Sequence, residues 1–213
     1  MEEYAIIVAG GIGSRMKSEV PKQFLLIDDV PIIVHSISSF LNYDDNINII
    51  VVLPEAHIDR WKEIKSNYFS DIEIRTVSGG LTRSASVLSG LTLIKKDGLV
   101  AIHDAVRPYV SSRTISESFK SAKDNGSGVS AVELKDSIRE LENDSSVARD
   151  RSKYVLVQTP QTFRIDDLKK AYEKVGVRLF TDDASVFEAA GYKVTLVKGS
   201  YDNIKITTPE DLK

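Results

Sequence analysis

A glycine-rich turn followed by two cations lies near the start of the chain, within AIIVAGGIGSRMKSEVPK at residues 5–22. The turn, residues 9–14, carries little side-chain bulk, so its backbone N–H groups can come close to a ligand. Arg15 and Lys22 follow, and Pro21 restricts the backbone just before the second cation. Free N–H groups and cations at this spacing are typical of a site that holds several phosphates.

Two common phosphate-binding motifs fit this turn poorly. A P-loop requires Gly-Lys-Ser/Thr, which does not occur in the chain. The dinucleotide fingerprint Gly-x-Gly-x-x-Gly starts at Gly11 and Gly13, but Met16 stands where its third glycine belongs. Because that glycine lets the helix pack close to the strand, Met16 disfavours a nicotinamide-dependent oxidoreductase, which is kept as an alternative.

A carboxylate and a guanidinium follow a second apolar run, in IHDAVRP at residues 102–108. Asp104 could bind a ribose hydroxyl or a divalent cation, and Arg107 could hold a phosphate with its forked donors. The two could equally form a structural pair that fixes the loop, and both interpretations stay open. His103 is assigned no chemistry.

A third cation and a second glycine pair complete the candidates. Lys205 alternates with the apolar Ile204 and Ile206, which predicts that it points to the opposite face of a strand. The sequence GGLTRSAS at residues 79–86 again places small residues between a strand and a helix. Its serines could cap that helix, or a serine hydroxyl and backbone amides could read the edge of a pyrimidine.

Strand-like and helix-like segments alternate and would position these residues. Strands are expected at 5–8, 47–53, 72–77, 99–102, around 128–132 and at 192–197, and helices at 31–41, 55–68, 81–94, 112–123, 165–175 and 182–190. This alternation predicts an α/β fold whose mainly parallel sheet carries helices on both faces. Ligands in such folds bind at the carboxyl ends of the strands, where the candidates lie.

The alternation stops between residues 133 and 158. Two stretches of alternating polarity, around 136–141 and 154–157, flank an acidic, serine-containing turn region. This pattern predicts a β-arm that leaves the sheet. Because an isolated two-stranded ribbon is marginally stable, we expect the arm to pair with a second subunit, with a surface loop as the alternative.

The composition excludes several classes of protein. The 213 residues predict one domain over 1–213, and 42% hydrophobic and 28% charged residues are ordinary for a soluble protein. A net charge of −3 predicts no general affinity for nucleic acid or for an anionic membrane. The chain has no cysteine, which excludes disulfides, a zinc–thiolate site and a cysteine nucleophile, and no metal site built from side chains is expected. The N-terminus lacks the features of a signal peptide, so a cytoplasmic protein is expected.

A series of motifs then runs in order over nearly the whole chain: AGGIGSRM with PKQF, GGLTRSASV, HDAVRP, DRSKY, QTPQTF, TDDAS and DNIKITTPEDL. Together they resemble the 2-C-methyl-D-erythritol 4-phosphate cytidylyltransferases of the non-mevalonate isoprenoid pathway, among the polyol-phosphate cytidylyltransferases. The resemblance implies a Rossmann-like three-layer sandwich with a protruding β-arm, in a homodimer whose arms complete each other's active sites. It also implies transfer of CMP from CTP to methylerythritol phosphate with release of pyrophosphate.

The resemblance also implies roles by motif position. The side chains implied to hold the CTP phosphates and the reacting phosphorus are Arg15, Lys22 and Lys205. The residues implied to surround the nucleotide are Ala9, Gly10, Gly11, Gly13, Gly80, Ser86, Asp104 and Ala105. Those implied to face the polyol phosphate are Arg107, Thr159, Thr181 and Lys205, with Ser137 and Arg151 from the partner's arm.

Two residues depart from the family pattern. Leu81 stands where a polar residue is expected, which removes a side-chain contact to the base. Ser137 replaces the usual threonine, although its hydroxyl can still bind phosphate. The alternatives are a ribitol-5-phosphate cytidylyltransferase, which shares two of the motifs, and a nucleotide-binding module without catalytic activity. Residues 181–185, TDDAS, favour methylerythritol phosphate.

The implied reaction needs electrostatic help more than a base. The second pKa of a phosphate monoester lies near 6, so the attacking oxygen is largely ionised at neutral pH. The difficulty is that two polyanions must meet and spread their charge at an in-line transition state. Fixed cations and backbone dipoles meet that need, with Mg²⁺ expected to be bound through the CTP phosphates.

Overall fold

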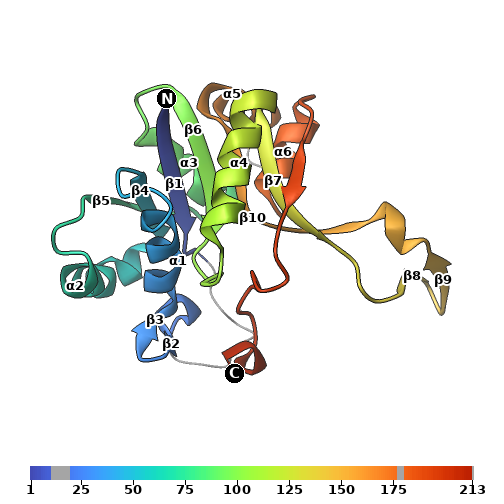
Figure 1. Cartoon of the computed structure of the whole chain (residues 1–213), viewed down its shortest axis with the longest axis horizontal. Coiled ribbons are helices and arrows are strands. Elements are labelled where there is room, and N and C mark those ends of the chain that lie inside the picture. The colour runs from blue at the N-terminus through green and yellow to red at the C-terminus, as the bar shows by residue number, and fades with distance from the viewer. Residues whose placement is uncertain (11–19, 177–179, 213) are drawn as a thin grey trace.

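The computed structural model describes residues 1–10, 20–176 and 180–212. Within these residues, one seven-stranded sheet has the spatial order β11, β7, β10, β6, β1, β4, β5 (Figure 1). Its strands are β1 (Glu2–Val8), β4 (Asn48–Leu53), β5 (Ile74–Ser78), β6 (Gly98–Asp104), β7 (Ser127–Glu133), β10 (Val155–Arg164) and β11 (Leu196–Lys198). The strands expected at 47–53 and 99–102 form as Asn48–Leu53 and Gly98–Asp104, and both are buried on both faces because helices cover both sides of the sheet.

The helices form two layers, one on each face of the sheet (Figure 1). On one face lie α1 (Ile32–Leu41), α2 (Ile58–Tyr68) and α4 (Ser112–Asn125). On the other lie α3 (Arg83–Thr92), α5 (Ile165–Val175) and α6 (Asp183–Ala189). Successive residues of β1 face opposite layers, so Ile7 packs in the first core and Ile6 in the second. This is the expected Rossmann-like three-layer sandwich.

The strand β10 is antiparallel to both of its neighbours, β6 and β7, whereas the other pairings in the sheet are parallel. Most of this strand was not expected, because residues 154–157 were assigned to the arm and the next element expected after Pro160 was a helix at 165–175. A proline interior to a strand removes a ladder hydrogen bond. Here the pairing register shifts between Val157 and Gln161, so Pro160 lies in the irregular part of the strand.

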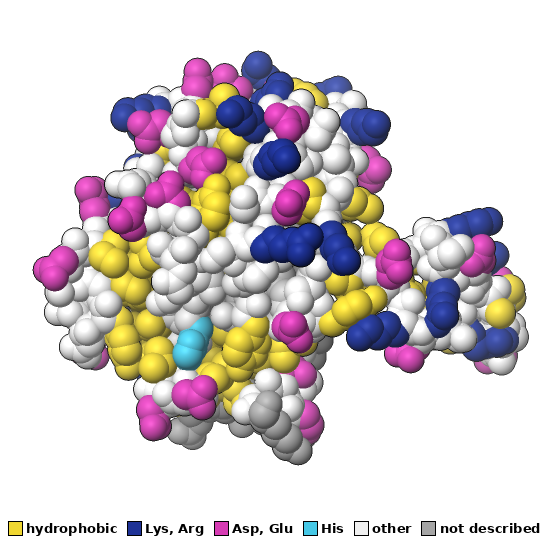
Figure 2. All heavy atoms as spheres, viewed as in Figure 1, with side chains coloured by type: hydrophobic (Ala, Val, Ile, Leu, Met, Phe, Trp, Pro, Cys, Tyr) yellow, Lys and Arg dark blue, Asp and Glu magenta, His cyan; other side chains and the backbone are white. Residues whose placement is uncertain are grey.

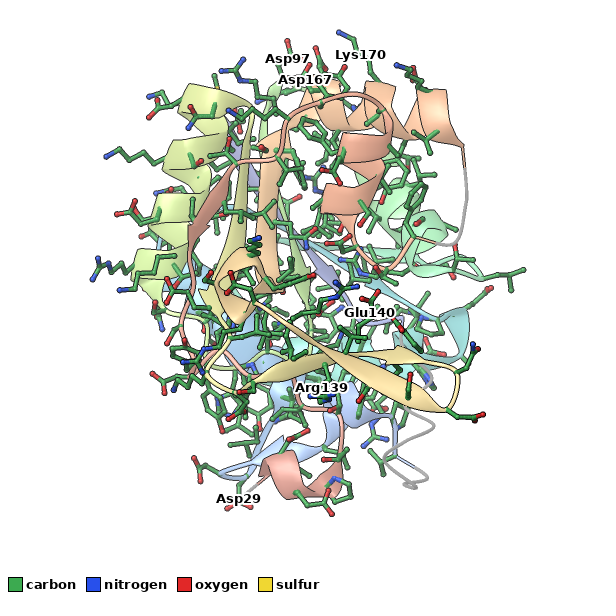
Figure 3. All side chains as sticks on the ribbon, turned by 90° about the vertical axis from the view of Figure 1, so that its right-hand side faces the viewer. Asp29, Asp97, Arg139, Glu140, Asp167 and Lys170 are labelled. Carbon is green, nitrogen blue, oxygen red and sulfur yellow. The ribbon has the colours of Figure 1, made fainter. Side chains whose placement is uncertain are left out.

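A two-stranded ribbon projects from the body of the molecule (Figure 1). The strands β8 (Ile138–Glu142) and β9 (Ser145–Arg149) pair with each other and not with the main sheet. Figure 3, viewed from the side on which this ribbon projects, shows Arg139 and Glu140 on it. The ribbon is the expected β-arm, and its apolar Leu141 is 84% exposed.

Short elements complete the described chain. They are the hairpin β2 (Leu26–Ile27) and β3 (Val30–Pro31) and the 3₁₀ turns η2 (Lys22–Phe24), η3 (Glu55–His57), η4 (Arg151–Lys153) and η5 (Pro209–Leu212). The expected strand at 192–197 is reduced to Leu196–Lys198, and residues 203–207 form no strand. Instead Ile206 is buried against Ile32 and Val106, and its N–H donates to the Val106 carbonyl at 2.9 Å. Over the described residues, no helix is long and apolar enough to cross a membrane.

Candidate active site

A cleft of about 210 Å³ opens at the carboxyl ends of β1 and β6. Its walls come from the end of β1, the segment around η2, the turn before α3, the turn after β6 and the segment near the C-terminus. The residues that line it are Val8, Ala9, Gly10, Lys22, Gln23, Gly80, Leu81, Thr82, Arg83, Asp104, Val106 and Lys205. Segments far apart in the sequence therefore meet at the strand ends, as a mainly parallel sheet requires.

The Asp104 carboxylate is the centre of a cluster of cations beside this cleft. Lys205 Nζ lies 2.9 Å and Arg107 Nε 3.4 Å from Asp104 Oδ2, and Arg83 Nε lies 3.8 Å from Oδ1. Burial alone would raise the pKa of Asp104, but these three cations together hold it well below its usual range. Asp104 is therefore ionised at neutral pH and keeps three positive side chains in one place.

The turn that carries Asp104 is fixed by a chain of buried hydrogen bonds. The Asp104 N–H donates to Thr159 Oγ1 at 3.1 Å, and this hydroxyl lies 3.1 Å from His103 Nδ1. His103 Nε2 lies 3.2 Å from the Arg107 carbonyl, which can only accept. Nε2 therefore carries the proton, and the Thr159 hydroxyl donates to Nδ1. Burial lowers the pKa of His103 to about 4, so the ring is neutral at pH 7.

Arg107 connects this turn to the segment that carries Lys205. Its Nη1 donates to the Asn203 carbonyl at 2.7 Å, and Asn203 Nδ2 donates to the Thr159 carbonyl at 2.8 Å. Burial lowers the pKa of Arg107 while Asp104 opposes that shift. The sequence analysis did not single out Asn203, which is fully buried. Its place two residues before Lys205 in the sequence was the available signal.

The glycine turns allow a close approach between β1 and α3. A Cβ on Gly10 would lie 3.3 Å from Ser86 Oγ, and a Cβ on Gly80 would lie 2.5 Å from the Ala85 Cβ. Gln23 Nε2 donates to the Ala9 carbonyl at 3.1 Å and fixes the other side of the turn. A larger residue at Gly10 would therefore push β1 away from α3, and one at Gly80 would collide with Ala85 in the first turn of that helix.

The start of α3 corrects one expectation. Neither serine caps this helix, because Thr82 does so by accepting from the Ala85 N–H at 3.1 Å. Ser86 Oγ instead donates to the Thr82 carbonyl at 3.0 Å. Its hydroxyl is therefore buried in the loop that forms the cleft wall, and the neighbouring Leu81 is fully exposed.

Arg83, in the first turn of α3, was missed by the sequence analysis. Its Nη1 lies 2.6 Å from Asp183 Oδ2, in addition to its contact with Asp104. A cation at the positive end of a helix is unfavourable unless a carboxylate compensates it. An arginine directly after a helix cap was thus a signal that an acidic partner from elsewhere faces this site.

The structure describes some, but not all, of the residues that were expected to bind the nucleotide and its phosphates. Arg15, Gly11 and Gly13 lie outside the described residues. The structure brings the following expected residues together at the cleft: Ala9, Gly10, Lys22, Gly80, Asp104 and Lys205. Ala105 is fully buried, and its N–H donates to the Val8 carbonyl at 3.0 Å, which joins β1 to the turn after β6.

The residues expected to face the polyol phosphate are more scattered. Arg107 and Thr159 are buried beside Asp104, where their polar groups bind other parts of the chain. Thr181 is exposed, two residues before Asp183. Ser137 and Arg151 are exposed on the arm segment, where the Arg151 guanidinium donates to the Lys135 carbonyl. Neither of these arm residues lines the cleft of its own chain.

The described residues contain no group of three or more histidines, aspartates and glutamates that could hold a metal ion. Asp104 is the carboxylate that lines the described cleft, and three cations already contact it. A divalent cation at this site would therefore need most of its oxygen ligands from a bound ligand.

Comparison with known proteins gives consistent matches. The family model described as 2-C-methyl-D-erythritol 4-phosphate cytidylyltransferase matches residues 4–213. A relative of that name from Azobacteroides pseudotrichonymphae is 46% identical over 99% of this chain and 96% of its own. One from Bacteroides fragilis is 45% identical over 98% of this chain and 95% of its own.

Solved structures match as well. The structure of 4-diphosphocytidyl-2C-methyl-D-erythritol synthase from Anaerococcus prevotii superposes with a TM-score of 0.85 at 29% identity, over 99% of this chain and 94% of that one. The structure of 2-C-methyl-D-erythritol 4-phosphate cytidylyltransferase from Thermus thermophilus gives a TM-score of 0.81 at 29% identity, over 100% and 96%.

Proposed function

The chain belongs to the 2-C-methyl-D-erythritol 4-phosphate cytidylyltransferase family, and we propose that the cleft at the carboxyl ends of β1 and β6 is its catalytic centre. The enzyme transfers CMP from CTP to 2-C-methyl-D-erythritol 4-phosphate in isoprenoid biosynthesis. One observation carries the assignment of the centre: three cations gather on the Asp104 carboxylate beside a cleft that Lys22 also lines.

The reaction is a displacement at the α-phosphorus of CTP. An oxygen of the polyol phosphate forms the new P–O bond, the α–β phosphoanhydride bond breaks, and pyrophosphate takes the electron pair. Because the second pKa of the phosphate monoester lies near 6, the attacking oxygen needs no general base at neutral pH. The buried, neutral His103 bonds to the turn on both sides and is not needed as one.

Positive side chains supply most of the catalysis in this proposal. Lys22, Lys205 and Arg15 hold the triphosphate and stabilise the charge that develops on it. Asp104 binds the ribose, and the backbone of Gly10 and Gly80 approaches the cytosine. Both glycines line the cleft, and a Cβ on either would press against Ser86 or Ala85, so the absence of a side chain lets these backbones lie close to the start of α3.

Mg²⁺ fits this site as an ion carried by the nucleotide. Among the residues that the structure describes, the cleft offers one carboxylate, Asp104, and its three cationic partners make it a poor sole ligand. We propose that the CTP phosphates provide the main ligands of the ion, with no cage of protein side chains. When bound, the ion neutralises phosphate charge in the transition state.

The second substrate is proposed to lie between Thr181 and the arm of a partner subunit. Thr181 precedes Asp183, which Arg83 connects to the cleft. Ser137 and Arg151 are exposed on an arm that projects away from the body of its own chain (Figure 1). A homodimer in which each arm reaches the other cleft would bring these groups to the polyol phosphate.

The apolar surface around the base of the arm supports the dimer. The consecutive residues Val155, Leu156 and Val157, where β10 returns from the arm, are 40%, 55% and 42% exposed, and Figure 2 shows hydrophobic side chains where the arm joins the body. Apolar residues exposed side by side are typical of protein interfaces. The dimer and the expected cytoplasmic location remain predictions.

A pyrophosphate-release assay tests the proposal. The protein is incubated with CTP and Mg²⁺, and with either methylerythritol phosphate or ribitol 5-phosphate. We expect release with the first polyol phosphate and little with the second. Release of pyrophosphate with ribitol 5-phosphate but not with methylerythritol phosphate would contradict the substrate assignment. Binding of CTP without release of pyrophosphate with either polyol phosphate would indicate a binding module.

A further inference from the structure

Arg83 contacts two carboxylates that belong to different parts of the site. Its Nη1 lies 2.6 Å from Asp183 Oδ2, and its Nε lies 3.8 Å from Asp104 Oδ1. Asp104 ends β6 and lines the nucleotide cleft, whereas Asp183 is the first residue of α6. One guanidinium therefore connects the start of α3 to both elements.

The contact between Arg83 and Asp183 is buried. The Asp183 side chain is completely buried and the Arg83 side chain is 21% exposed. Burial would lower the pKa of Arg83, but Asp183 and Asp104 together raise it above its ordinary value, so the charge is permanent. A buried carboxylate that lost this cation would be left without compensation, which is costly.

Asp183 is also held from its other side. The Tyr172 hydroxyl of α5 donates to Asp183 Oδ1 at 2.6 Å. Burial first, and the neighbouring Asp183 second, raise the pKa of Tyr172, so its hydroxyl remains a donor. The carboxylate is thus fixed between α5 and α3, with Arg83 as its charged partner.

The backbone at the start of α6 is fixed by the same group of residues. The N–H groups of Asp183 and Ala184 donate to Gln161 Oε1 at 3.0 and 2.9 Å, and Gln161 Nε2 donates to Asp182 Oδ2 at 3.0 Å. Thr181 lies immediately before this fixed start. Its position relative to Asp104 is set both by Gln161 of β10 and by Arg83, which contacts Asp183 and Asp104.

We propose that Arg83 is a positioning residue that holds the nucleotide-binding turn at Asp104 and the segment with Thr181 at the separation needed for both substrates. The inference rests on the proposed function, in which Asp104 faces the ribose and Thr181 faces the polyol phosphate. Arg83 itself acts through these two groups. A lysine could keep the charge but not both contacts, since its ammonium is a single point charge.

The test compares Arg83→Gln, Arg83→Lys and the double variant Arg83→Gln/Asp183→Asn with the full-length wild-type enzyme. Thermal midpoints and the KM values for CTP and for methylerythritol phosphate are measured for each. Arg75→Gln is the matched control, because Arg75 on β5 is also partly buried, bonds the Leu93 carbonyl and, like Arg83, has an unpartnered buried Nη2 within the described residues.

We expect Arg83→Gln to lower the thermal midpoint and to raise both KM values by about tenfold or more, since a charge-assisted contact to each side is lost. The double variant removes the unpaired buried charge, so its midpoint should recover while both KM values stay high. Arg83→Lys should fall between wild type and Arg83→Gln. The control Arg75→Gln should leave both KM values unchanged.

Two outcomes would overturn the inference. If the double variant recovers wild-type KM values together with its midpoint, Arg83 only stabilises the fold. If the KM for CTP rises but that for methylerythritol phosphate does not, the connection to Thr181 is wrong. If Arg83→Gln fails to fold, the thermal midpoints and KM values of Arg83→Lys and of the double variant are compared with those of the wild type instead. Absence of turnover in the wild-type enzyme would instead contradict the proposed function.

Discussion

Replacing Asp104 with asparagine removes the charge that holds three cations together while keeping the size of the side chain. The Asp104 side chain is 11% exposed, as is that of Arg107, and Arg83 is 21% exposed. The Lys205 side chain is 39% exposed, so solvent screens its contribution. The energetic effect should therefore come mainly from the two arginines, which would lose a buried counter-charge.

Removing one partner of a buried ion pair costs about 3–5 kcal/mol. Arg83 keeps Asp183 and Arg107 keeps the Asn203 carbonyl in the variant, so we expect the lower end of this range. For a chain of this length, a loss of about 3 kcal/mol corresponds to a fall of about 6–12 °C in Tm. The amide oxygen introduced by Asp104→Asn can still accept hydrogen bonds, so the change reports the charge.

The effect should depend on pH. The cations hold the pKa of Asp104 below that of a free aspartate, which is about 3.9. The stability that the carboxylate contributes is therefore fully present above about pH 4 and is lost as the pH falls further. The difference in Tm between wild type and Asp104→Asn should be greatest at neutral pH and should narrow in acid.

Thermal unfolding of the two proteins at pH 7 and at pH 3 measures both expectations. Asp59→Asn is the matched control, because Asp59 pairs with Lys62 at 2.7 Å on the surface, with both side chains largely exposed. The Tm of Asp59→Asn should equal that of the wild type. If Asp104→Asn also melts with the wild type at pH 7, the cluster does not stabilise the fold and the reasoning fails.

Two further predictions concern the reaction, and a third concerns the pH dependence of folding stability. Lys22→Ala should lower kcat by roughly 10²–10³-fold with an unchanged circular dichroism spectrum, by analogy with the loss of one oxyanion donor; an unchanged rate would contradict the role of Lys22. Arg151→Ala should raise the KM for the polyol phosphate more than that for CTP, and the opposite order would show that the arm contacts the nucleotide. Burial lowers the pKa of His103 to about 4, so the unfolded chain binds an extra proton between about pH 6.5 and 4, and stability should fall as the pH drops through this window. His103→Gln should make the free energy of unfolding depend less on pH in this window. Urea titrations of both proteins at several pH values measure this, and an equal pH dependence would refute the assignment.

Patterns that depend on local sequence were predictable. The helix at Ile165–Val175 has the expected bounds because its buried residues, Ile165, Leu168, Ala171 and Tyr172, recur at helical spacing and Gly176 follows its end. The strand at Asn48–Leu53 was equally clear, since β-branched residues fill it. Gly10 and Gly80 also lie just after strands β1 and β5, where the α/β alternation placed them.

Features that depend on distant partners were not predictable. The strand Val155–Arg164 contains a proline that local rules treat as a break, and pairing on both sides overrides that preference. Lys205 reaches Asp104 without the expected strand, because hydrogen bonds from Ile206 to Val106 and at Asn203 hold its segment. The role of Arg83 depends on Asp104 and Asp183, which sequence spacing alone could not bring together.

The strand β10 has a consequence for how the arm and the nucleotide turn behave together. Val155, where the chain returns from the arm, and Thr159, whose hydroxyl fixes the turn at Asp104, belong to the same strand. Thr159, the residue that bonds to the Asp104 turn, thus lies only four positions along β10 from Val155 at the base of the arm. In the proposed dimer, a displacement of the arm would therefore act on the strand whose Thr159 holds the turn at Asp104.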